Sequence, residues 1–398
     1  MDGSSSPPLN YTSPRIQREV FRSHLLLSDQ EILDLGIRPC DVELYRRRHY
    51  QASFSINTWY DALREHTFRT ETVDLSFEEA QSIVTVFLSK RQAGVDLSKE
   101  RDILQKLAVR LDWIIKNDFN RRCFIKLNTR SPKDAPIYDF NSQTVKKAII
   151  SEISRLEPQE RDDNNETIAF VKATNRCLVT SSGIEAVQVL TRSMRIYEDL
   201  IKCIQFGEKH FEAKLVIREW LEEVINKPEM EFRCFVCKNQ MNAITQYFSM
   251  CHFPDLAPRK EEIQKKILHF FDTQLKNKLT HNNYVVDLFI GRDRILIIEL
   301  NPFHNGAGAG LFSWATDRDT LMNGPLEFKI LLQPAHNVRE HVPDQWQRLI
   351  SSEFHNSEDE DDEDPDIDEP VAYWPWTLAA VMVVGSVITG RLTSRFEI

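Results

Sequence analysis

Three side chains that carry metal-binding oxygens lie in two apolar runs near residue 290: Asp287 in the first run, Glu299 and Asn301 in the second. The polar stretch 291–294 separates the runs, which predicts a β-hairpin. Glu299 and Asn301 share one face of their strand, and a three-residue loop would place Asp287 opposite Glu299. Facing carboxylates repel and are costly to bury among apolar side chains. Mg²⁺ with a phosphate in its oxygen shell would compensate them, so the spacing favours a magnesium site.

The same spacing also fits a half-exposed hairpin, because a strand with one solvated face has a polar residue at every second position. The magnesium interpretation makes a further prediction. Because the two carboxylates would repel each other in an empty site, the Asp287→Ala variant is expected to keep its fold and to gain stability.

Single basic residues interrupt three other apolar, strand-like segments: Lys126, Arg218 and Arg233. A single basic residue in such a strand is often paired with a carboxylate or extends to the surface. Three of them together with an acidic hairpin are suited to neutralising a triphosphate.

Several motifs that define known classes of site are absent from the sequence or do not match it. The glycines of the run 301–314 match neither the dinucleotide fingerprint nor the phosphate-binding loop that ends in Gly-Lys-Ser/Thr. The nucleophile motif G-x-S-x-G and the zinc motif H-E-x-x-H are absent from the sequence, so hydrolases defined by them lose support. Cys234 and Cys237 are separated by an odd number of positions in a predicted strand, which places their thiols on opposite faces and argues against zinc.

Composition predicts a folded, reduced protein with two or three packed units in 398 residues. The seven cysteines are an odd number, and the first residues have no apolar signal core, so we expect a chain that faces the cytosol. The net charge is −10, and eleven acidic residues against two arginines follow position 357. Residues 1–357 are almost neutral and lack a block of basic residues, so no direct contact with nucleic acid is expected.

The elements that must position these residues mix helices with hairpin-forming strands, which predicts an α+β fold. Helices are expected at 16–35, 103–115, 142–156, 184–201 and 261–279, and strands at 123–128, 214–220, 231–236, 241–248, 284–290 and 295–301. The polar stretch 157–166 is expected to be a solvated loop. The expected divisions are a disordered lead (1–13), a helical extension (14–53), the main body (54–350), an acidic disordered linker (351–370) and an apolar helix (371–390).

Residues 371–390 contain no charged side chain, and as a helix they would cover roughly 30 Å, the thickness of a bilayer core. Tyr373, Trp374 and Trp376 lie at one end, where aromatic rings favour a membrane interface. The segment therefore predicts a tail anchor in the mitochondrial outer membrane or the endoplasmic reticulum, with the body in the cytoplasm. The alternative is a buried terminal helix or strand of a soluble domain.

The chain resembles the cell division cycle 123 family, whose members have an ATP-grasp-like fold. The blocks that carry the resemblance, in the family's order, are WYDALREHTFRTETVDL (59–75), IKLNTRSPKDA (125–135), LVIREW (215–220), EFRCFVCKNQMNAITQY (231–247), YVVDLFI (284–290), IIELNPF (297–303) and LFSW (311–314). The resemblance implies an ATP-grasp-like body of mixed and antiparallel sheets with packed helices.

The resemblance also implies a nucleotide site. The residues implied to contact ATP are Lys126, Ser131, Lys133, Arg176, Arg218 and Arg233, and those implied to bind Mg²⁺ are Asp287, Glu299 and Asn301. Glu299 stands where the family usually has Asp, and Arg176 where it usually has Lys. The extra methylene of Glu299 shifts its carboxylate by about one bond, which changes the expected metal geometry.

The function implied by the resemblance is that of an ATP- and Mg²⁺-binding assembly chaperone for translation initiation factor 2, acting through the gamma subunit of that factor. This interpretation favours a binding protein over an enzyme. Two alternatives remain open. One is an ATP-grasp ligase that activates a carboxylate as an acyl phosphate, and the other is a nucleotide-degenerate interaction protein tethered to a membrane.

Overall fold

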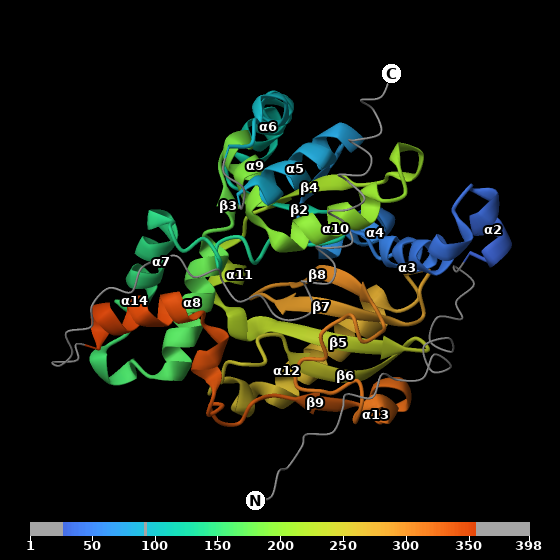
Figure 1. Cartoon of the computed structure of the whole chain (residues 1–398). Helices are drawn as coiled ribbons and strands as arrows, with labels where there is room; N and C mark the ends of the chain where they lie inside the picture. The colour runs from blue at the N-terminus through green and yellow to red at the C-terminus, as the bar shows by residue number, and fades with distance from the viewer. Residues whose placement is uncertain (1–26, 91–93, 356–398) are drawn as a thin grey trace, which may run out of the picture. The chain divides into compact units, whose positions relative to one another are not determined.

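The computed structural model describes residues 27–90 and 94–355 (Figure 1). The described residues up to Glu353 belong to one compact unit, which contains both sheets. The predicted lead (1–13) and apolar helix (371–390) lie outside the described residues, as does most of the predicted acidic linker. None of the helices within the described ranges is both long enough and apolar enough to cross a bilayer.

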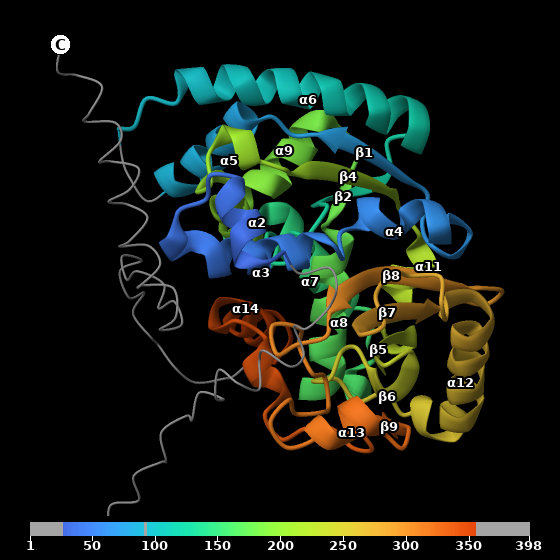
Figure 2. The same ribbon diagram turned by 90° about the vertical axis from the view of Figure 1, so that its right-hand side faces the viewer.

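The first sheet has four antiparallel strands, and one of its faces packs against helices. Along β4 the alternation of side chains sends Leu215 and Ile217 into the core shared with these helices, while Val216 and Arg218 point to the opposite face. Figures 1 and 2 show α5, α6 and α9 gathered on the same side of this sheet. The strands in order are β1 (Thr70–Asp74), β4 (Lys214–Glu219), β2 (Cys123–Leu127) and β3 (Val179–Thr180), and the helices are α5 (Phe77–Ser89), α6 (Ser98–Phe119), α9 (Gly183–Arg192) and α10 (Met194–Ile204).

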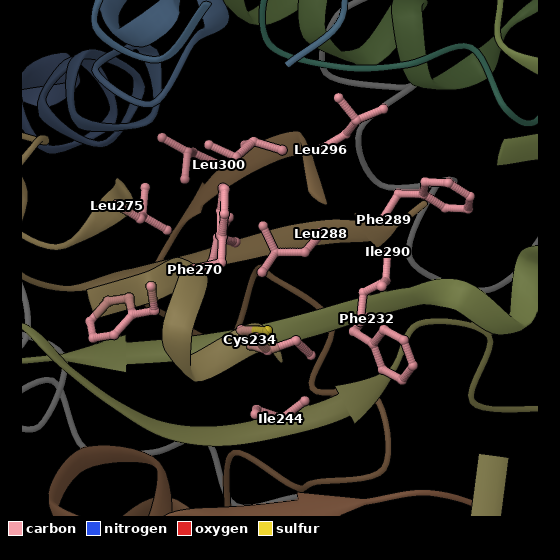
Figure 3. Close-up of a cluster of buried hydrophobic side chains, with 14 of the residues drawn as sticks. Phe232, Cys234, Ile244, Phe270, Leu275, Leu288, Phe289, Ile290, Leu296 and Leu300 are labelled. Atoms are coloured by element: carbon pink, nitrogen blue, oxygen red, sulfur yellow. The ribbon is translucent and has the colours of Figure 1, made fainter. Parts of the chain in front are cut away.

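The second sheet has five strands and is covered on both faces. One face packs against α12 and α4 in the largest apolar core, part of which Figure 3 shows around Phe232 and Leu288. The other face packs against the segment that follows β8, through Phe235, Phe303 and Phe312. The strands are, in sheet order, β8 (Ile295–Pro302), β7 (Tyr284–Ile290), β5 (Glu231–Cys237), β6 (Gln240–Gln246) and β9 (Glu327–Lys329). The helices are α4 (Ile56–Leu63), α12 (Leu256–Phe270), the short π-helix Phe271–Leu275 and α13 (Arg318–Asn323).

The remaining helices lie outside the two sheets. In both Figures 1 and 2, α7, α8 and α14 lie together beside the second sheet. The helices are α2 (Asp29–Asp34), α3 (Val42–Ala52), α7 (Gln143–Ile153), α8 (Asp163–Arg176), α11 (Glu222–Asn226) and α14 (Asp344–Phe354), with 3₁₀ turns at Pro39–Asp41, Arg64–His66, Pro158–Glu160, Glu208–His210, Pro228–Met230 and Val338–His341. Because α14 continues to Phe354, the first residues of the predicted linker are helical.

Two predictions about local structure were wrong. The expected helix 184–201 is two helices, because Ser193 adopts an extended conformation and its hydroxyl accepts a hydrogen bond from the Ile196 amide at the start of α10. The expected solvated loop 157–166 contains the start of α8, where the Asp162 carboxylate accepts from the amide of Asn165 at 2.7 Å. In both places a capping residue, which the apolar periodicity does not register, decides where the helix begins.

The prediction about the cysteine pair is confirmed. Cys234 packs in the core on one face of the second sheet, and Cys237 packs in the core on the other. Within the described residues, no group of three or more His, Cys, Asp or Glu side chains is arranged to hold a metal ion.

Candidate functional site

The predicted opposition of Asp287 and Glu299 is confirmed, but the loop that produces it differs from the predicted one. Ile290 pairs with Ile295, so the turn has four residues rather than three. In this register Asp287 would face Ile298. A β-bulge between Asp287 and Leu288 shifts the pairing by one residue, so that Asp287 pairs with Glu299.

Asp287 is fully buried, and its charge is compensated by an arginine of the neighbouring strand. Arg233 on β5 donates from Nε to Oδ1 at 2.8 Å and from Nη2 to Oδ2 at 2.7 Å. Its third nitrogen, Nη1, donates to the carbonyl of Gly308 at 2.8 Å. Every residue of β7 is buried, so the half-exposed hairpin does not describe this strand.

Glu299 pairs with a cation from the first sheet. Lys126 on β2 lies with its Nζ 3.3 Å from Glu299 Oε2, and only 5% of the lysine side chain is exposed. Burial lowers the pKa of Lys126, and Glu299 opposes that shift. Burial alone would raise the pKa of Glu299, but Lys126, Lys133 and Arg233 outweigh it and hold that pKa well below the ordinary value. Glu299 is therefore ionised at neutral pH.

Asn301 completes the predicted oxygen triplet. Its Nδ2 lies 3.5 Å from Asp287 Oδ2, and its side chain is on the same face of β8 as Glu299. The structure therefore brings Asp287, Glu299 and Asn301 together, as the spacing predicted.

A second polar cluster adjoins this triplet. Lys133 Nζ donates to the hydroxyl of Tyr247 at 3.0 Å and lies 4.0 Å from Glu231 Oε1. This Glu231 oxygen is buried and has no hydrogen-bond partner among the described residues. Burial raises the pKa of Glu231 to about 7, and Lys133 only partly opposes the shift.

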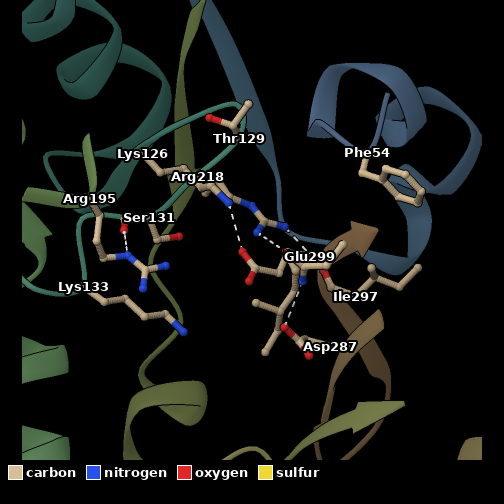
Figure 4. A network of polar contacts seen from close by, with 12 residues as sticks. Phe54, Lys126, Thr129, Ser131, Lys133, Arg195, Arg218, Asp287, Ile297 and Glu299 are labelled. Carbon is tan, nitrogen blue, oxygen red and sulfur yellow. Dashed lines mark hydrogen bonds and ion pairs between the residues drawn. The ribbon is translucent and has the colours of Figure 1, made fainter. Parts of the chain in front are cut away.

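Figure 4 shows Lys126, Lys133 and Arg195 extending from one side toward Glu299, which lies with Asp287 on the other side. Arg195 and Tyr247 were not predicted as site residues. Arg195, near the start of α10, donates from Nε to the carbonyl of Ser131 at 2.9 Å, and so fixes the loop that carries Lys133. A helical arginine has no sequence signal for such a role, whereas Tyr247 lay in a block shared with the family.

Two predicted basic residues make their hydrogen bonds with groups other than these carboxylates. Arg218 on β4 donates to the Ile298 carbonyl of β8 at 2.7 Å and therefore lies between the two sheets. Arg176 on α8 donates to Glu152, Glu222 and Asn226, none of which belongs to the cluster around Glu299. A contact between Arg176 and nucleotide stays a prediction.

The charges of the cluster are suited to binding an anion. Lys126 and Arg218 are buried, and Arg233 and Lys133 are partly exposed. These four cations lie near three buried or nearly buried carboxylates, Asp287, Glu299 and Glu231. The excess of positive charge in a partly desolvated setting would be balanced by a multiply charged ligand such as a phosphate.

Fold and site together define an α+β protein in which charged residues converge where β2 of one sheet meets β8 of the other. Residues 168–368, half of the chain, match the D123 family model. The chain belongs to the D123 family, and the resemblance to the cell division cycle 123 family is confirmed.

Several curated proteins are similar to parts of the chain. A Dictyostelium discoideum protein named translation initiation factor eIF2 assembly protein is 35% identical over 101 residues, 25% of this chain and 26% of that protein. A Xenopus laevis protein of the same name is 30% identical over 119 residues, 30% of this chain and 34% of that protein. The matched regions thus cover about a quarter to a third of these relatives. Cell division cycle protein 123 of Eremothecium gossypii is 24% identical over 283 residues, 65% of this chain and 73% of that protein.

A solved structure of Cdc123 from Schizosaccharomyces pombe shares the fold. It is 19% identical, with 72% of this chain and 98% of that chain covered and a TM-score of 0.50. A C-terminally truncated form of the same protein gives a TM-score of 0.52 at the same identity and coverage. The predicted mixed α+β fold is thereby confirmed.

Proposed function

We propose that this chain is an ATP- and Mg²⁺-binding factor, with an ATP-grasp-like body, that promotes assembly of translation initiation factor 2 through its gamma subunit. One observation carries the proposal. Lys126 and Lys133 converge on the oxygen triplet of Asp287, Glu299 and Asn301, in a chain of the D123 family. The names of the Dictyostelium and Xenopus relatives support the role in assembly.

The residues present fit a magnesium–nucleotide complex by their chemistry. Carboxylate and amide oxygens are the ligands that Mg²⁺ prefers, and Asp287, Glu299 and Asn301 would hold it. When bound, Mg²⁺ neutralises phosphate charge. Lys126 would exchange its contact with Glu299 for one with phosphate oxygens, and the unpartnered Glu231 oxygen offers an acceptor to a donor group of the ligand.

Calorimetric titration tests the nucleotide part of the proposal. ATP is titrated into the purified chain with Mg²⁺ and with EDTA, and the Asn301→Ala variant serves as the metal-site probe. Binding that Mg²⁺ strengthens, and that weakens in the variant when Mg²⁺ is present, supports the proposal. Binding that neither EDTA nor Asn301→Ala changes would mean that the triplet does not hold a metal.

A capture experiment tests the partner. The tagged full-length chain is expected to retain the purified gamma subunit of translation initiation factor 2 and to raise the yield of the complete factor from its separated subunits. If the gamma subunit is not retained, while ADP is released in the presence of a small carboxylate, the assembly function fails and the ligase alternative gains.

We further propose that residues 371–390 tether the chain to a membrane. The proposal rests on the uncharged sequence of this segment and on its aromatic residues. Extraction of cell membranes with alkaline carbonate is the test, and we expect the full-length chain in the pellet and a chain truncated after Pro370 in the supernatant. Release of both into the supernatant would exclude the tether.

A further inference from the structure

The position of Glu299 depends on one extra residue in β8. Leu288 pairs with Ile297 and Asp287 pairs with Glu299, so Ile298 has no partner across the hairpin. Such a residue leaves its backbone carbonyl outside the ladder, and this partly buried carbonyl then needs a hydrogen bond from elsewhere. Because β8 is an edge strand of its sheet, no further strand of that sheet supplies one.

The missing hydrogen bond comes from the other sheet. Arg218 on β4 donates from Nη1 to the Ile298 carbonyl at 2.7 Å. Its Nη2 donates to Thr67 Oγ1 at 2.6 Å and lies 3.4 Å from the Ile297 carbonyl, to which Thr67 also donates at 2.6 Å. Figure 4 shows Arg218 reaching across to the strand beside Ile297. Two successive carbonyls at the bulge are thus bound by side chains from outside the second sheet.

These contacts select one of two registers. Without the bulge, the regular hairpin that starts at the Ile290–Ile295 pair would place Ile298 opposite Asp287. Side chains alternate along a strand, so Glu299 would then point to the other face and leave Lys126. In the bulged register, Glu299 faces both Asp287 and Lys126.

We infer that Arg218 is a positioning residue: it binds the carbonyl of the bulge residue Ile298 and thereby holds Glu299 beside Asp287 and Lys126. This inference assigns Arg218 a role through β8 rather than the direct nucleotide contact that the family resemblance implies. The claim that the position of Glu299 matters for ligand binding rests on the proposed function. The guanidinium is well suited to the role, because its planar fork can bind two acceptors at fixed angles, whereas an ammonium cannot.

Hydrogen exchange followed by mass spectrometry tests the inference in the full chain without any ligand. In Arg218→Met, peptides from residues 295–303 are expected to exchange roughly tenfold faster than in the native chain, while peptides of β5 and β6 keep their rates. Arg218→Lys, which keeps the charge, is expected to resemble Arg218→Met. The matched control is Arg339→Met, because Arg339 also donates hydrogen bonds from a partly buried guanidinium, to Asp163 and Ser351.

Deletion of Ile298 provides a rescue that a general structural role would not give. The deletion removes the bulge residue and lets a regular ladder place Glu299 opposite Asp287. We therefore expect Arg218→Met to accelerate hydrogen exchange in β8 when Ile298 is present. In the chain that lacks Ile298, the same substitution is expected to have little further effect. Unchanged exchange of β8 in Arg218→Met, equal loss of protection in both sheets, or no rescue by the deletion would each overturn the inference. If Arg218→Met does not fold, Arg218→Lys provides the same comparison.

A separate measurement, on the native chain, tests the proposed function independently of the inference about Arg218. Titration of the native chain with Mg²⁺ and ATP shows whether the site binds nucleotide, and an absence of binding there would overturn the proposed function alone. If the native chain binds, Arg218→Lys is expected to lose affinity roughly tenfold with Mg²⁺ and to change little with EDTA, because the fault lies in the placement of Glu299. An equal loss under both conditions would indicate a direct contact with nucleotide and would overturn the inference.

Discussion

Arg233 and Asp287 face each other on the adjacent strands β5 and β7 and are joined by two parallel hydrogen bonds of 2.8 and 2.7 Å. The arginine side chain is 12% exposed and the aspartate is fully buried. This pair, rather than a metal ion alone, compensates the buried aspartate. It therefore reverses the expectation that loss of Asp287 would stabilise the chain.

Asp287→Ala is expected to lower the free energy of unfolding by about 3–5 kcal/mol, because it leaves the Arg233 cation buried without its partner. Urea unfolding followed by circular dichroism measures the change. The double variant Asp287→Leu with Arg233→Met removes both charges and is expected to recover most of the loss. A single variant as stable as the native chain would show that Arg233 finds water or another acceptor.

Lys126→Ala is expected to weaken ATP binding roughly tenfold, and more than Lys133→Ala does. Lys126 lies on a strand and is 5% exposed, so packing holds it in place, whereas Lys133 lies in a loop and is 28% exposed. Calorimetry with Mg²⁺ measures both affinities, and Lys202→Ala, a substitution on α10 of a lysine paired with Asp199, is the control. The reverse order of the two variants would mean that the phosphates lie nearer the loop.

The stability of the fold is expected to decrease as the pH rises from about 4.5 to about 7, because of Glu231. Burial raises the pKa of this side chain to about 7 from its usual 4.5, so within this interval the folded chain holds a proton that the unfolded chain has lost. The contribution to the unfolding free energy falls by about 3 kcal/mol as the pH rises.

The comparison that isolates this effect is Glu231→Gln, which cannot ionise. The variant is expected to be more stable than the native chain at pH 8, and the difference should shrink as the pH falls to 4.5. A difference that does not vary with pH would show that Glu231 is already ionised at low pH, held by Lys133.

Gly183→Ala is expected to destabilise the first sheet's helical layer by about 1–3 kcal/mol or more. A Cβ atom at this position would lie 1.7 Å from the backbone oxygen of Ala108, so α9 would have to move away from α6. Thermal unfolding measures the loss. Ile184→Ala, at a neighbouring side chain that is 54% exposed, is the control and should change stability by less than about 0.5 kcal/mol.

The sequence by itself determined the features that depend on local spacing. The two apolar runs around the turn 291–294 predicted the hairpin, and the alternation of side chains predicted that Glu299 and Asn301 share a face. The same alternation predicted that Cys234 and Cys237 point to opposite faces. Each of these statements follows from the two-residue period of a strand, which needs only neighbouring residues.

Only the tertiary structure decided which charges meet. Lys126 pairs with Glu299 across 173 positions, and Arg218 binds the Ile298 carbonyl across 80 positions. The register of Asp287 and Glu299 depends on a bulge whose carbonyl is bound from the other sheet, so turn length alone could not predict it. Local periodicity fixes the face of a strand, but the partner of a buried charge is chosen by the packing of segments that are distant in sequence, and desolvation makes that choice energetically decisive.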